Sequence, residues 1–144
     1  MMKFISKLAL AILIAGIFIL LVSGNLLSIS PFIMAGQLLA IVISIWARRS
    51  FHAGQFNIHA EPREGQLLLT GPYRYIRHPM YAAALLLVWS GILGHLHPVN
   101  IIIGLIITGV SAVRIADEEM ILRSHFTEYA EYERTTKRII PFLI

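Results

Sequence analysis

The stretch GPYRYIRHPMY, residues 71–81, separates two apolar halves of the chain. Gly71 and Pro72 are turn residues, so they predict a turn at the start of this stretch. Pro79 has no backbone N–H group and a fixed φ angle, which suits the first turn of a helix. The apolar run that follows, residues 80–94, predicts that this helix crosses or enters a membrane.

Arg77 and His78 stand just before this predicted helix. A helix N-terminus offers unpaired N–H groups and the positive end of the helix dipole, which favour a carboxylate or a phosphate. The motif is therefore a candidate anion-binding site. The same tyrosines and arginines are also typical of an interfacial belt that anchors a membrane helix at the lipid headgroups.

The composition is that of a membrane protein. Apolar residues make up 57% of the 144 residues and charged residues 14%, against about 45–50% and about 25% in soluble domains. The chain has no cysteine, which excludes disulfides, thiolate metal sites and a cysteine nucleophile. The net charge of +4 comes from basic residues at the ends of apolar runs, so it indicates membrane topology and no nucleic-acid partner.

We expect an all-α integral membrane protein formed by a single domain, residues 1–144. Its apolar runs predict four transmembrane helices, at about residues 4–22, 29–47, 79–94 and 98–113. A cytoplasmic loop, residues 48–78, joins the second and third spans, and a C-terminal amphipathic helix is expected at residues 115–134.

Two features of the first two runs leave alternatives open. Lys3 and Lys7 at the start of the first run also resemble the charged end of a cleavable signal peptide. Gly36 and Ala40 have the small-xxx-small spacing that lets helices approach closely. We expect this pair to be a chance occurrence, because such pairs are common in membrane helices.

The basic residues give the orientation. All twelve lysines and arginines lie before or at the start of the first span, in the central loop or after the fourth span, and the other two connectors have none. The positive-inside rule then places both termini, the central loop and the candidate site in the cytoplasm.

A second polar cluster follows the fourth span. Arg114 and Glu118 are four residues apart and share one face of a helix, whereas Glu119 points about 100° away from Glu118. An arginine beside carboxylates at the end of a span is costly unless it is paired or functional. An ordinary interfacial salt bridge would give the same spacing. No metal site is expected, because His95 and His97 are best explained as turn residues.

These two motifs resemble the isoprenylcysteine carboxyl methyltransferase family, which is grouped with the phospholipid N-methyltransferases. The resemblance covers about residues 60–144 and rests on residues 71–81 followed, after one helical hairpin, by Arg114, Glu118, Glu119, Leu122, His125, Phe126, Tyr132, Ile140 and Pro141. It implies a membrane-embedded methyltransferase whose cofactor, S-adenosyl-L-methionine, enters from the cytoplasm.

The resemblance also implies the roles of individual residues. Arg114 would face the methyl acceptor, and Glu118 would bind the ammonium group of the cofactor. The remaining cofactor-binding residues would be Gln66, Leu67, Leu68, Tyr73, His78, Pro79, Met80, Tyr81 and Glu119, to which the residue chemistry adds Arg77 as a partner for the cofactor carboxylate. The expected acceptor is a lipophilic small molecule or a lipid, reached from the surrounding membrane lipids.

Some positions depart from the family pattern. Ala83 and Thr127 stand where the family usually has glycine, and the spacing from Phe126 to Tyr129 is one residue short. These changes concern how the last helix packs. Two other functions also fit the chain: an NADPH-dependent membrane reductase of the sterol-reductase-like type, which normally has more spans, and a small membrane protein without enzymatic activity. The sequence leaves the acceptor and the oligomeric state undetermined.

Overall fold

The computed structural model describes residues 2–51 and 67–140, with side chains from residue 6 onward. Within these ranges the protein is all-helical. The elements are α1 (Met2–Val22), α2 (Pro31–Arg49), the 3-10 helix η1 (Gly71–Arg74), α3 (Pro79–Gly94), α4 (Pro98–His125) and α5 (Tyr129–Thr135). The described part also contains one isolated parallel β-bridge, between Ile76 and Lys137.

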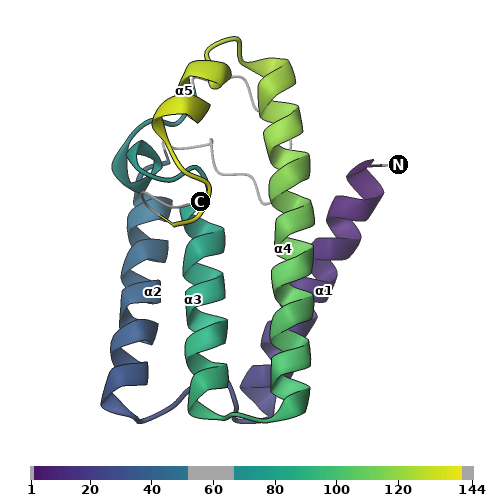
Figure 1. The fold of residues 1–144 in the computed structure, drawn as a ribbon, viewed down its shortest axis with the longest axis vertical. Helices are drawn as coiled ribbons and strands as arrows, with labels where there is room; N and C mark the ends of the chain where they lie inside the picture. Colours follow the sequence, from purple (N-terminus) through teal and green to yellow (C-terminus); the bar gives the residue numbers. More distant parts are fainter. Residues whose placement is uncertain (1, 52–66, 141–144) are drawn as a thin grey trace.

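The long helices form two packed pairs. Helix α2 lies along α3, and α1 lies behind α4, while α3 and α4 stand side by side in the middle of the bundle (Figure 1). The short helix α5 folds back from the end of α4 and lies over the end of the bundle that carries η1 (Figure 1). The two segments that carry the sequence motifs are thus brought to the same end of the molecule.

Prolines start three of the long helices, as their missing N–H groups allow. Helix α3 spans Pro79–Gly94, as predicted. Helix α2 is shifted by two residues at each end, because it begins at Pro31 and includes the arginines at its C-terminus. The predicted turn at Gly71 is η1, and Gly71 has a φ angle of 62°, which favours glycine.

The prediction of a separate amphipathic helix at residues 115–134 is wrong. Helix α4 continues without a break from Pro98 to His125, and the chain turns only at residues 126–128 before α5. Arg114 marks a change in polarity, but neither it nor its neighbours are helix breakers, so the backbone stays helical. The charged residues that follow Arg114 therefore belong to the same continuous helix as the apolar run before it.

The core lies between α1, α3 and α4. It contains Leu13, Leu20, Leu26, Val88, Ile92 and Ile107. The expectation that the spacing of Gly36 and Ala40 is a chance occurrence is also wrong. A Cβ atom added at Gly36 would lie 2.7 Å from Oγ of Ser90, so this glycine allows the close approach of α2 and α3.

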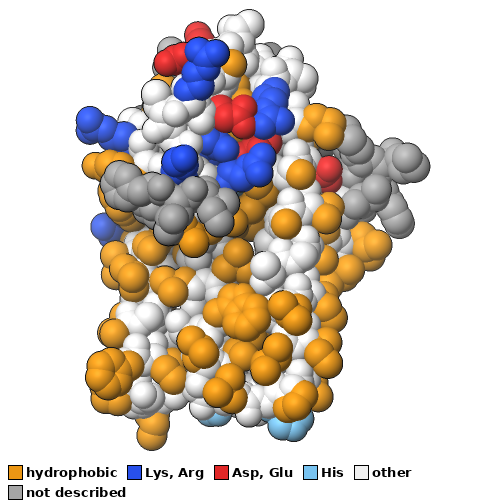
Figure 2. Space-filling view, viewed as in Figure 1, with side chains coloured by type: hydrophobic (Ala, Val, Ile, Leu, Met, Phe, Trp, Pro, Cys, Tyr) orange, Lys and Arg blue, Asp and Glu red, His pale blue; other side chains and the backbone are white. Residues whose placement is uncertain are grey.

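Two helices, α2 and α4, are long and apolar enough to cross a membrane. The apolar parts of α1 and α3 are shorter, so four crossings remain a prediction. Helix α4 has 28 residues, a length of about 42 Å, which exceeds the hydrocarbon thickness of about 30 Å. Charged side chains gather at the end formed by α5 and the C-terminal part of α4, and hydrophobic side chains cover most of the rest of the visible face (Figure 2).

Candidate active site

The candidate site lies where the start of α3 meets the charged part of α4. Both adjacent carboxylates of α4 face the motif of residues 77–81, and both lie beside the His78 ring, but their other partners differ. Glu118 keeps 22% of its side-chain surface exposed, whereas Glu119 keeps only 1%. The two residues therefore have to be considered separately.

Glu118 belongs to a cluster with Tyr81 and Arg114. One carboxylate oxygen of Glu118, Oε1, accepts hydrogen bonds from the Tyr81 hydroxyl and, at 3.2 Å, from Nη2 of Arg114. Nε of Arg114 donates to the same tyrosine hydroxyl at 2.7 Å. The other oxygen, Oε2, lies 3.6 Å from Nδ1 of His78. This oxygen is the part of Glu118 best placed to receive a further donor.

Arg114 is also fixed by the first helix. Its Nη1 atom donates to the backbone oxygen of Ser6 at 2.8 Å and to the Ser6 hydroxyl at 3.2 Å. Both residues are buried. The guanidinium group thus ties α1 to α4 and holds Glu118 and Tyr81 in place.

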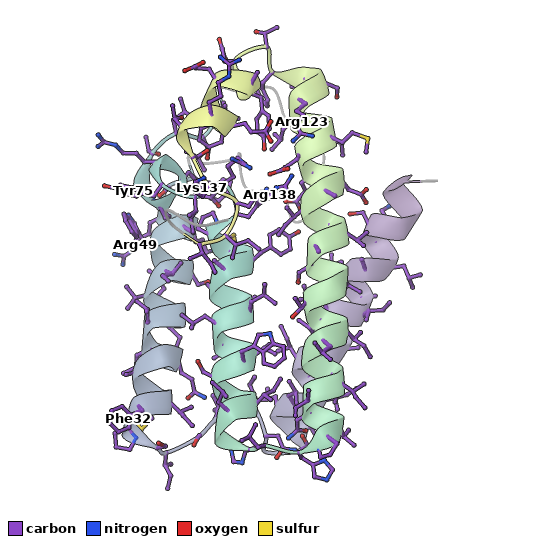
Figure 3. All side chains as sticks on the ribbon, in the orientation of Figure 1. Phe32, Arg49, Tyr75, Arg123, Lys137 and Arg138 are labelled. Atoms are coloured by element: carbon purple, nitrogen blue, oxygen red, sulfur yellow. The ribbon has the colours of Figure 1, made fainter. Side chains whose placement is uncertain are left out.

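Glu119 is a buried carboxylate at the centre of a cluster of basic residues. Its carboxylate accepts hydrogen bonds from Arg77 at 3.0 Å, Arg138 at 2.9 Å and Arg123 at 3.4 Å, and Nε2 of His78 lies 3.5 Å away. In Figure 3, Arg123 from α4 and Arg138 from the C-terminal segment both lie beside the end of the bundle covered by α5. Burial by itself would raise the pKa of Glu119, but the contacts with His78, Arg138 and Arg77 outweigh it and hold the pKa well below its usual range.

Only some of the backbone N–H groups around the start of α3 have hydrogen-bond acceptors among the described residues. The N–H groups of Arg77 and His78 donate to the carbonyl oxygens of Lys137 and Arg138, at 2.7 and 2.9 Å. The His78 side chain does not cap the helix. Among the described residues, no acceptor bonds the next free N–H groups, those of positions 80 and 81. They remain available to an anion at this helix N-terminus.

Two tyrosines connect α5 to η1, just before the start of α3. The Tyr132 hydroxyl of α5 donates to the backbone oxygen of Tyr73 at 2.7 Å. The Tyr73 ring makes an edge contact with Phe51, with ring centroids 5.5 Å apart. Burial, with smaller effects from Tyr132 and Glu118, raises the pKa of the Tyr73 phenol above its usual value. Tyr73 therefore stays neutral at physiological pH.

A scan against protein-family models matches residues 26–129 to the phospholipid methyltransferase family, which is more than half of the chain. The chain belongs to this family. No curated protein and no solved structure matches it significantly. The family supports a methyltransferase that acts on lipid substrates, and so favours methyl transfer over the reductase and the non-enzymatic alternatives.

In this phospholipid methyltransferase family member, most of the expected site residues lie together at one end of the molecule, around the start of α3. Six of them are joined by direct contacts: Arg77, His78, Tyr81, Arg114, Glu118 and Glu119. Pro79 is fully buried, Met80 is half-buried, and Leu67 and Leu68 are half-buried next to η1. Gln66 lies outside the described residues.

Sequence reasoning missed several residues that hold the site together. Arg123 is four residues after Glu119, so helical spacing offered a signal for this pair. Arg138 comes from a segment beyond α5, and Ser6 lies 108 residues from Arg114 in the chain. No local pattern identifies such distant partners.

The two histidines at the opposite end have structural contacts. A ring nitrogen of His95 lies 2.8 Å from the Leu27 carbonyl oxygen. Nδ1 of His97 accepts a hydrogen bond from the Val99 N–H group at the start of α4. Across residues 2–51 and 67–140, no group of three His, Cys, Asp or Glu side chains is placed to hold a metal ion.

Proposed function

We propose that the protein is an S-adenosylmethionine-dependent methyltransferase that acts on a membrane-soluble acceptor at the cytoplasmic face. The acceptor would be an isoprenoid or lipid carboxylate, or a lipid amine. The observation that carries this proposal is Glu118, a partly exposed carboxylate held beside the start of α3 by Tyr81 and Arg114. Family membership supplies the reaction class.

The donor set fits the amino-acid part of the cofactor. Oε2 of Glu118 would bind its ammonium group, and the N–H groups of Met80 and Tyr81 would bind its carboxylate. Tyr73, with Leu67 and Leu68, would cover the adenosine. When bound, S-adenosylmethionine supplies an electrophilic methyl group on a positively charged sulfur, and neutral tyrosine rings suit such a cation.

For Arg114 and Arg77, the contacts favour supporting roles. Arg114 donates to Ser6, Tyr81 and Glu118, so it would orient the edge of the site that faces the acceptor. Arg77 donates to Glu119, so we assign it to the frame around the cofactor carboxylate.

Methyl transfer is an in-line displacement, in which the protein mainly positions the reactants and excludes water. A carboxylate acceptor needs no base. An amine acceptor must first lose a proton to become a nucleophile.

The experiment is calorimetric titration of the detergent-purified protein with S-adenosylhomocysteine, the product form of the cofactor. We expect saturable binding that weakens by at least about tenfold in Glu118→Gln, because a charged hydrogen bond is lost while the shape is kept. The control is Glu131→Gln, since this α5 glutamate is exposed and pairs only with exposed Arg134 among the described contacts.

Two results would contradict the proposal. One is a folded wild-type protein that binds no S-adenosylhomocysteine, and NADPH would then be the next titrant. The other is equal weakening by Glu118→Gln and Glu131→Gln, which would remove Glu118 from the site.

A further inference from the structure

We propose that Glu119 is a positioning residue that clamps the C-terminal segment across the start of α3 and thereby shapes the cofactor site. We call residues 133–138, which comprise the end of α5 and the segment directly after it, the C-terminal strap. This inference rests on the proposed function for its catalytic meaning. The clamp itself rests on contacts alone.

Glu119 has no surface to offer a ligand. Its side chain is 1% exposed, and both carboxylate oxygens are already bonded to guanidinium groups. Arg138 alone contacts both oxygens, at 2.9–3.2 Å. A carboxylate surrounded in this way stabilises its surroundings and is poorly placed to bind the ammonium group of a cofactor.

Arg77 connects Glu119 to the strap. Its Nε atom donates to Glu119, and its Nη1 atom donates to the backbone oxygens of Glu133 and Thr136, at 3.1 and 2.7 Å. One guanidinium group thus bonds α4 and two points of the strap. Since Arg77 itself belongs to the segment before α3, the carboxylate fixes both pieces of chain at once.

The strap then forms the parallel bridge with the segment before α3. Lys137 donates its N–H to the Tyr75 carbonyl oxygen at 3.2 Å and accepts from the Arg77 N–H at 2.7 Å. The next residue, Arg138, accepts from the N–H of His78. The strap therefore sets where the His78 backbone lies, and His78 is the residue whose ring reaches Glu118.

The adjacent glutamates consequently have different tasks. Glu118 presents a partly exposed oxygen to the candidate site, and Glu119 acts through the strap and His78. The contrast gives a test, because a positioning role can be replaced by another link between the strap and α3, whereas a direct contact with the cofactor cannot.

The chain has no cysteine, so a cysteine pair introduced by Ile76→Cys and Lys137→Cys is a specific cross-link across the bridge. The measurements are S-adenosylhomocysteine affinity by calorimetry and amide hydrogen exchange at residues 77, 78 and 137. They are made on the wild type, on Glu119→Gln, on Glu119→Gln with the oxidised cysteine pair, and on Glu131→Gln as the control.

We expect Glu119→Gln to speed exchange at these three amides and to weaken binding by about tenfold or more, because three guanidinium groups lose their shared charged acceptor. Oxidation of the cysteine pair should restore affinity to within about threefold of the wild type, and reduction should abolish the recovery. Glu131→Gln should behave as the wild type.

The inference is overturned if exchange in Glu119→Gln stays as slow as in the wild type, or if the cross-link forms and slows exchange without restoring affinity. Should the wild type fail to bind S-adenosylhomocysteine, the proposed function fails, yet the exchange data still decide whether Glu119 holds the strap. If oxidation leaves the pair unlinked, the exchange comparison between Glu119→Gln and Glu131→Gln decides it.

Discussion

Glu118 and Glu119 are neighbours in the sequence, yet the helix directs them into different environments. A step of about 100° around α4 turns one carboxylate toward Tyr81 and Arg114 and the other into the basic cluster. Sequence motifs that pair two acidic residues suggest one shared function. At the scale of single residues, the structure instead separates a partly exposed carboxylate, Glu118, from a buried one, Glu119.

The low pKa of Glu119 predicts how stability depends on pH. A carboxyl group with a lowered folded-state pKa contributes stability that is complete above its unfolded pKa of about 4.3 and is lost as the pH falls through the folded pKa. Glu133 adds to this in the same direction, since its hydrogen bond with Arg123 lowers its pKa. The midpoint temperature of thermal unfolding in detergent should therefore be nearly constant from about pH 7 to pH 5 and fall steeply below about pH 4.

Glu119→Gln tests this assignment. It should destabilise the protein by about 1–3 kcal/mol near neutral pH and flatten the acid part of the profile. Glu131→Gln should change neither, because its partner Arg134 is exposed and such pairs contribute little. If the stability of Glu119→Gln still falls below about pH 4 as it does in the wild type, other carboxyl groups cause the loss of stability in acid.

At the scale of the elements, glycines set how closely helices and loops approach. A Cβ atom added at Gly91 of α3 would lie 2.3 Å from the backbone oxygen of Leu26, which cannot move as a side chain would. Gly91→Ala should therefore destabilise the protein by about 1–3 kcal/mol in detergent unfolding. The matched control is Gly109→Ala in α4, where nothing lies within 4 Å and alanine should stabilise the helix by up to about 1 kcal/mol. Equal effects at both positions would contradict the packing of α3 against the connector before α2.

The elements also show what the sequence can predict. The sequence predicted α3 with the bounds it has. A proline at the helix start and the apolar run that follows it are both local signals. The continuation of α4 past Arg114 was missed, since a change from apolar to charged residues alters the surface of a helix and leaves its backbone unchanged. The pairing of Glu119 with Arg138 depends on how α5 folds back, and no local pattern encodes it.

At the scale of the whole molecule, α1 is more than an added anchor. The family match begins at residue 26, after α1 has ended. Yet α1 places Leu13 and Leu20 in the core and supplies Ser6 to the guanidinium group of Arg114. The site therefore depends on a helix that lies outside the matched segment.

The orientation of the molecule in the membrane can be tested directly. Our proposed topology places the turn between α3 and α4 outside the cytoplasm and α5 inside it. Leu96 in that turn is 69% exposed, the Glu131 side chain of α5 is 73% exposed, and the natural chain has no cysteine. In spheroplasts, a membrane-impermeant maleimide should label Leu96→Cys directly, and Glu131→Cys only after lysis. Unmodified protein, which should stay unlabelled, is the control.

Two outcomes would contradict this topology. If both variants are labelled from the same side, α4 does not cross the membrane. If the pattern is reversed, the candidate site faces away from the cytoplasm, where S-adenosylmethionine is made.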